Sequence, residues 1–162
     1  MFPEDVVRLA EALVAGAQAR GLMLATAESC TGGLLAGAIT AIPGSSAVLE
    51  RGFVTYSNAA KSELLGVSPE LLADHGAVSG PVARAMAQGA ARAAGVSLAV
   101  SITGVAGPGG GSAEKPVGLV HFGCTGPRGS VHQEHRFGDR GRDRIRLESV
   151  RVALALLLDQ LA

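Results

Sequence analysis

The feature that most constrains the fold is an alternation of short apolar runs with longer helical stretches along the whole chain. Apolar residues at helical spacing, or alanine-rich runs, predict helices at residues 4–20, 34–40, 58–67, 80–94 and 143–161, with a short helix at most at 69–74. Short apolar or alternating runs predict strands at residues 22–26, 53–56, 98–103, 117–122 and 131–137. This order predicts one α/β domain over residues 1–162. We expect a layered sandwich with a central, mixed sheet covered by helices on both faces.

Composition excludes several classes of protein. The 14 basic and 14 acidic residues balance, and aromatic residues make up 3%, so the chain has neither the charge nor the stacking rings expected of a nucleic-acid partner. The N-terminus carries acidic residues where a signal peptide would carry lysine or arginine. No apolar run is long enough to cross a membrane. Two cysteines form neither a disulfide framework nor a zinc site. We therefore expect a cytoplasmic protein without a metal or a membrane partner.

The first candidate site is the segment AESCTGG, residues 27–33, between a predicted strand and a predicted helix. In α/β proteins ligands bind at such strand ends. The glycines allow a ligand to approach the backbone, and the free amides at a helix start attract a phosphate or an oxyanion. The candidate residues are Ser29, Cys30, Thr31, Gly32 and Gly33. The alternative is that Ser29 or Thr31 only caps the helix.

The second candidate site is TYSNAAK, which contains Tyr56, Asn58 and Lys61. A neutral lysine can activate a serine when burial or a nearby cation lowers its pKa. A tyrosine hydroxyl could relay a proton or orient the leaving group. The alternatives are a solvated helix lysine and an ordinary strand tyrosine, while Ser57 or Asn58 caps the following helix.

The third candidate site is the glycine-rich segment 103–118, which begins with Thr103 and Gly104 and contains Lys115. Its spacing does not fit a Walker loop. It could form a lid or a nest for a phosphate, with Lys115 as a donor. The alternative is a mobile surface loop.

Cys30 is the strongest competitor of Ser29 as nucleophile, because a thiolate is favoured at a helix start. None of the four histidines lies in a triad-like sequence context, although a triad is a spatial arrangement. A cysteine in this position is also common as a buried packing residue. Spacing alone leaves the choice between Ser29 and Cys30 open.

The segments AESCTGG, ERGFVTYSNAAKSELLGV, HGAVSGPVARAMAQGA and SITGVAGPGGGSAEKPVGLV, taken together, resemble the CinA C-terminal domain family. The resemblance implies hydrolysis of nicotinamide mononucleotide to nicotinate mononucleotide and ammonia, in pyridine nucleotide salvage and without a cofactor. It implies Ser29 as nucleophile, Lys61 and Tyr56 as its catalytic partners, and Thr103 at the site. We expect the remaining substrate-binding residues to be Cys30, Thr31, Gly32, Gly33, Asn58, Gly104 and Lys115, and the protein to be a homodimer.

One segment departs from the family pattern. The family has a G-D-R sequence closely followed by another arginine, whereas this chain reads GDRGRDRIR at residues 138–146. Either Arg140 or Arg142 takes the usual place. Two other functions also stay open: an amidase for a different small amide, and a non-enzymatic regulatory module linked to competence or DNA damage.

Overall fold

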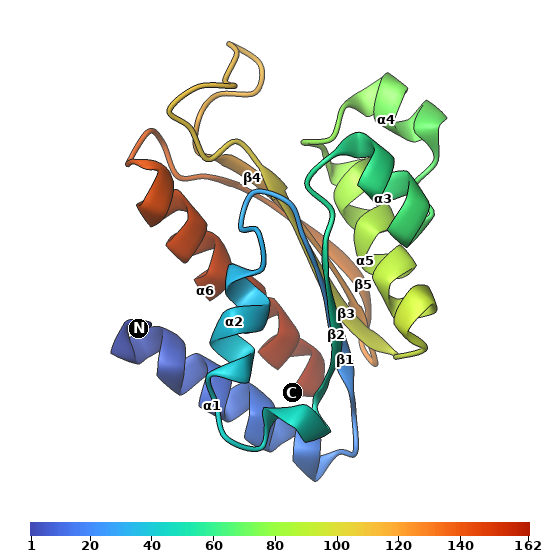
Figure 1. The fold of residues 1–162 in the computed structure, drawn as a ribbon, viewed down its shortest axis with the longest axis vertical. Coiled ribbons are helices and arrows are strands. Elements are labelled where there is room, and N and C mark those ends of the chain that lie inside the picture. Colours follow the sequence, from blue (N-terminus) through green and yellow to red (C-terminus); the bar gives the residue numbers. More distant parts are fainter.

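The computed structural model describes all 162 residues and shows a five-stranded mixed sheet with the strand order β2-β1-β3-β4-β5 (Figure 1). The strands are β1 (Leu24–Glu28), β2 (Leu49–Val54), β3 (Leu98–Gly104), β4 (Leu119–Gly126) and β5 (Gly129–Arg136). β1 runs parallel to β2 and β3, whereas β4 is antiparallel to both β3 and β5. The carboxyl ends of β1, β2 and β3 therefore lie at one edge of the sheet.

Six helices cover the two faces of the sheet, which confirms the predicted sandwich (Figure 1). One face carries α1 (Glu4–Ala19), α2 (Leu34–Thr40) and α6 (Arg142–Leu161), with the larger core of 26 buried residues. The other carries α3 (Asn58–Leu65), α4 (Pro69–His75) and α5 (Gly80–Ala94), with a core of 9. A short 3-10 helix, Ser45–Ala47, precedes β2. None of the helices combines the length and apolarity needed to span a bilayer.

Several predicted strand boundaries were wrong. The strand expected at 22–26 is Leu24–Glu28, and the strand expected at 53–56 is Leu49–Val54. The first extends to Glu28 because this residue is buried and its backbone is in register with Val54 and Ile102 on the two neighbouring strands. Charged residues make β2 resemble a loop in sequence, but it is a partly exposed edge strand that tolerates them. The strands expected at 117–122 and 131–137 are Leu119–Gly126 and Gly129–Arg136.

Serine caps begin all three helices on the second face. Ser57, Ser68 and Ser79 each accept a hydrogen bond from a backbone N–H in the first turn of α3, α4 and α5. The cap of α3 is thus Ser57, which leaves the Asn58 side chain free to face the neighbouring pocket.

A glycine brings α3 close to α5. A Cβ atom at Gly89 of α5 would lie 1.9 Å from the carbonyl oxygen of Leu65, at the end of α3. Only a residue without a side chain permits this backbone approach. The contact holds α3 against the sheet-covering helix, and α3 carries the buried Lys61.

Candidate active site

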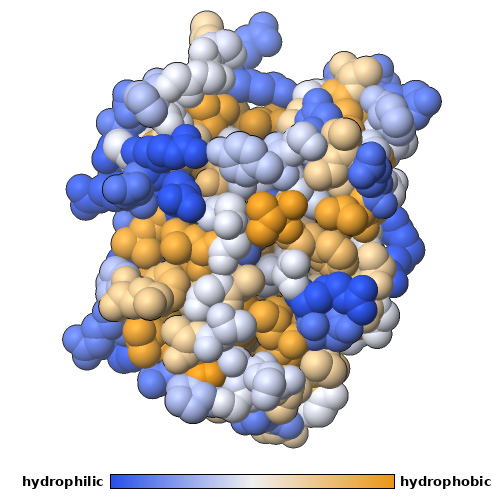
Figure 2. All heavy atoms as spheres, viewed as in Figure 1, coloured by the Kyte–Doolittle hydropathy of each residue, from blue (hydrophilic) through white to orange (hydrophobic).

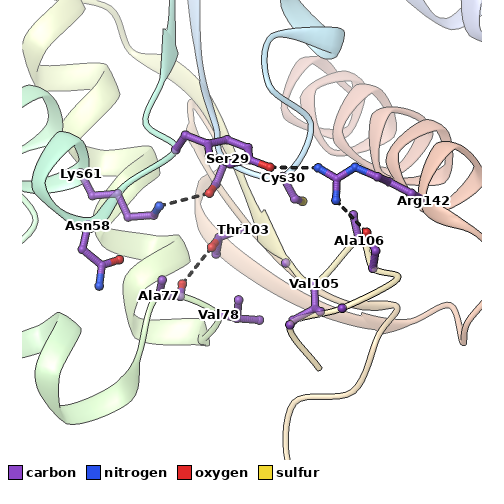
Figure 3. Close-up of a pocket in the computed structure, with 15 residues that line it drawn as sticks. Ser29, Cys30, Asn58, Lys61, Ala77, Val78, Thr103, Val105, Ala106 and Arg142 are labelled. Carbon is purple, nitrogen blue, oxygen red and sulfur yellow. Dashed lines mark hydrogen bonds between the residues drawn. The ribbon is translucent and has the colours of Figure 1, made fainter. Parts of the chain in front are cut away.

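A pocket of about 300 Å³ lies where β1, β2 and β3 end. It brings together residues from all three candidate segments: Ser29, Cys30, Tyr56, Asn58, Lys61, Thr103 and Gly104 (Figure 3). In the space-filling view, the opening between the glycine-rich loop and the α3–α4 region shows apolar atoms among polar ones (Figure 2). This position matches the edge of an α/β sheet at which ligands bind.

Ser29 and Lys61 are in direct contact, as the sequence predicted. The Lys61 Nζ lies 3.1 Å from the Ser29 Oγ (Figure 3). It also donates to the Thr55 carbonyl at 2.8 Å. Lys61 is only 1% exposed, and no carboxylate lies within ion-pair distance of it. Burial lowers the pKa of Lys61 from its ordinary value. A neutral amine fits both contacts, because it donates to Thr55 and offers its lone pair to the serine hydroxyl.

Cys30 also lines the pocket, and its thiol is buried. Burial raises the pKa of the Cys30 thiol to about 11. The thiol is therefore protonated at neutral pH, and the reactive thiolate is scarce. These surroundings favour Ser29 over its neighbour.

We expected the free N–H groups at the start of α2 to bind substrate, but they bind a side chain of the protein. The Glu28 carboxylate accepts hydrogen bonds from the N–H groups of Leu35 and Ala36, at 2.9 and 3.0 Å, in the first turn of α2. The Gly32 N–H donates to the Ser29 carbonyl at 3.0 Å. A buried protein carboxylate therefore occupies the anion-binding position that we expected to be open to substrate.

Thr31, Gly32 and Gly33 accordingly do not line the pocket, and Thr31 is fully buried. The N–H of Cys30 finds no acceptor in the chain, although Cys30 lines the pocket. Buried N–H groups are nearly always paired, so an unpaired one next to Ser29 is available to a ligand.

Arg142, in the first turn of α6, lies at the pocket, unlike its neighbour Arg140. Its Nη1 donates to the Gly107 carbonyl at 2.7 Å and its Nη2 to the Tyr56 hydroxyl at 2.9 Å (Figure 3). Tyr56 is 61% exposed, so this pair forms the solvent-facing rim of the pocket.

Thr103 contacts the segment that joins α4 to α5, and Lys115 contacts the last residue of α4. The Thr103 Oγ1 donates to the Ala77 carbonyl at 2.9 Å, which holds Ala77 and Val78 in the pocket wall. Lys115 does not line the pocket, because its Nζ donates to the His75 carbonyl. The structure therefore gives no support to Lys115 as a phosphate donor.

Sequence reasoning missed two parts of the site. The apolar wall of Ala77, Val78, Val105 and Ala106 carries no motif, and its position depends on how loops pack. Arg146 of α6 contacts the turn after β1, and only its place in GDRGRDRIR gave a signal. No group of three or more potential metal-ligating side chains occurs in the structure.

Comparison with known proteins identifies the family of this chain. The family model described as the CinA C-terminal domain matches residues 6–161, so the chain belongs to this family. A CinA-like protein of Anaeromyxobacter dehalogenans (strain 2CP-1 / ATCC BAA-258) is 54% identical over 97% of this chain. The chain spans only 38% of the length of that relative.

A relative of similar length carries a more specific name. Nicotinamide-nucleotide amidohydrolase PncC of Escherichia coli (strain K12) is 49% identical over 99% of this chain and 97% of its own length. Among solved structures, the competence/damage inducible protein CihA from Agrobacterium tumefaciens has a TM-score of 0.98 at 53% identity, covering 100% of this chain and 99% of that one.

Proposed function

We propose that this protein hydrolyses the carboxamide of nicotinamide mononucleotide to nicotinate mononucleotide and ammonia, with Ser29 as nucleophile and Lys61 as base. The observation that carries the proposal is the contact between the buried Lys61 Nζ and the Ser29 Oγ at the wall of a small pocket. Similarity to PncC of E. coli supports the substrate.

The reaction follows from the arrangement of these groups. Lys61 takes the Ser29 proton while Oγ forms a bond to the amide carbon, and the carbonyl oxygen becomes an oxyanion. The unpaired Cys30 N–H stabilises this charge. Lys61 then gives the proton to the nitrogen, the C–N bond breaks and ammonia leaves. A water molecule, deprotonated by Lys61, hydrolyses the acyl-enzyme and restores Ser29.

Arg142 is the proposed partner of the substrate phosphate. Its guanidinium is the one cationic group of the pocket lining apart from Lys61, and its present contacts are to a neutral carbonyl and a neutral hydroxyl. A phosphate forms stronger, charge-assisted hydrogen bonds with a guanidinium. Tyr56 holds Arg142 at the rim and faces the substrate from there, and the apolar wall receives the pyridine ring.

The test is ammonia release from nicotinamide mononucleotide, nicotinamide, nicotinamide riboside, NAD and glutamine. We expect nicotinamide mononucleotide to be cleaved much faster than nicotinamide or the riboside, since both lack the phosphate. Equal turnover of all three would remove the phosphate contact from the proposal. No ammonia from any of them would favour a non-enzymatic module.

We also propose a cytoplasmic homodimer. Light scattering of the purified protein tests the oligomeric state, with a monomer as the contradicting result. Fractionation of the producing cell tests the location.

A further inference from the structure

Arg146 is a half-buried cation that binds backbone rather than a carboxylate. Its Nε donates to the Cys30 carbonyl at 3.1 Å and its Nη2 to the Thr31 carbonyl at 3.0 Å. It forms no ion pair. The side chain comes from α6, and the two carbonyls lie in the turn that contains the nucleophile. A planar guanidinium binding two successive carbonyls restrains both peptide groups at once.

These contacts complete a set that fixes the turn. The Gly32 N–H binds the Ser29 carbonyl, so the carbonyls of Ser29, Cys30 and Thr31 all accept hydrogen bonds. In a trans peptide the N–H points opposite to the carbonyl of the same unit. The held Ser29 carbonyl therefore sets the direction of the Cys30 N–H, and Arg146 fixes the peptide group that follows. The result is a fixed backbone N–H, at the residue that follows Ser29, that makes no hydrogen bond to another residue.

We infer that Arg146 is a positioning residue for the reaction: it holds the Ser29–Cys30–Thr31 backbone so that the Cys30 N–H meets the oxyanion. The inference rests on the proposed function for its substrate. It needs no contact between Arg146 and substrate, and Arg146 does not line the pocket. Removing it should affect the transition state more than substrate binding.

The first test compares Arg146→Ala with the matched control Arg144→Ala. Arg144 is exposed on the same helix and makes no hydrogen bond to the turn. We expect Arg146→Ala to lower kcat by about tenfold to a hundredfold, less than the loss of a whole oxyanion donor, with KM within about threefold. Added guanidinium ion should restore part of kcat. Arg144→Ala should match the native protein.

A substrate-independent measurement separates this inference from the proposed function. In reaction with a fluorophosphonate, the Ser29 Oγ forms a bond to phosphorus, the P–F bond breaks, fluoride leaves and the serine proton passes to Lys61. Negative charge develops on the phosphoryl oxygen beside the same Cys30 N–H. Mass spectrometry should show labelling of Ser29 slowed in Arg146→Ala by a factor similar to that for kcat.

The kinetic and labelling results test the proposed function and the role of Arg146 separately. Native protein that is labelled at Ser29 but releases no ammonia would contradict the proposed function, while the labelling rates still test Arg146. A folded Arg146→Ala with native kcat and native labelling would overturn the inference, as would absence of labelling in the native protein. If Arg146→Ala does not fold, Arg146→Lys decides. A lysine cannot hold both carbonyls in one plane, so native rates in folded Arg146→Lys would also overturn the inference.

Discussion

Two segments meet at the pocket, and they are built in opposite ways. The turn after β1, residues 29–33, is held by buried polar contacts: Glu28 binds the start of α2, and Arg146 binds two carbonyls. The loop 105–118 is exposed over its middle, residues 108–114, and side-chain contacts of Arg142 and Lys115 tie it to the rest of the protein. Chemistry requires fixed geometry, whereas substrate entry requires a segment that can adjust. We therefore call the turn after β1 the rigid side of the site, and the exposed loop with Arg142 and Tyr56 its adaptable rim, and the predictions below test this contrast.

The largest expected effect is on the rigid side. Ser29→Ala should lower turnover by at least about a thousandfold, the scale seen when a catalytic nucleophile is removed. Cys30→Ala is the control, since it removes the neighbouring thiol at little cost in volume, and it should keep most activity. Ammonia release is the measurement, with circular dichroism to confirm folding. An inactive, folded Cys30→Ala beside an active Ser29→Ala would assign the reaction to the thiol.

Lys61→Arg tests whether the rigid side needs a base rather than a positive charge. Arginine stays protonated in proteins, so we expect a loss of about 10²–10⁴ in kcat. In the native protein burial lowers the pKa of Lys61, and the reactive form is the neutral one. Activity should therefore rise with pH, with a midpoint below the ordinary lysine value of 10.5. A flat pH profile across the neutral range, or an active Lys61→Arg, would contradict this role.

Arg142→Gln tests the adaptable rim. Loss of a charged hydrogen bond to phosphate should raise KM for nicotinamide mononucleotide by about tenfold to a hundredfold. Cleavage of nicotinamide riboside should change little, because it has no phosphate. Steady-state kinetics on both substrates give the comparison. An equal effect on the two substrates would show that Arg142 acts by holding Tyr56 and Gly107 rather than by binding phosphate.

The smallest effects come from a pair of glycine substitutions. Gly33 has φ +98°, a backbone conformation that disfavours a side chain, so Gly33→Ala should cost about 1–2 kcal/mol of unfolding free energy. In the loop, a Cβ at Gly109 meets nothing within 4 Å, and Gly109→Ala should stay within about 0.5 kcal/mol. Denaturant unfolding measures both. Equal losses would remove the contrast between the two segments.

Sequence patterns predicted those features of the fold and the site that are determined by residues close together in the chain. The alternation of helices and strands gave the sandwich, and the segments around Ser29 and Lys61 identified the contact that the structure shows. Patterns failed where a side chain meets a distant backbone group. Glu28 resembled part of a loop but caps α2, and Lys115 resembled a phosphate ligand but binds the carbonyl of His75. Arg146 contacts a turn more than a hundred residues earlier in the chain, and no spacing rule encodes that contact.

The close approach of Gly89 to the Leu65 carbonyl determines which missense mutations the protein tolerates at this codon. Every single-nucleotide substitution that changes a glycine codon to another amino acid introduces a side chain, so no missense step at this codon preserves the contact. The smallest such replacement, alanine, would push α3 outward and let water reach the lysine that this helix keeps dry. A mutation in a helix that does not line the pocket would then change the pKa of the proposed base, and a genetic screen would record it as a loss of the proposed activity.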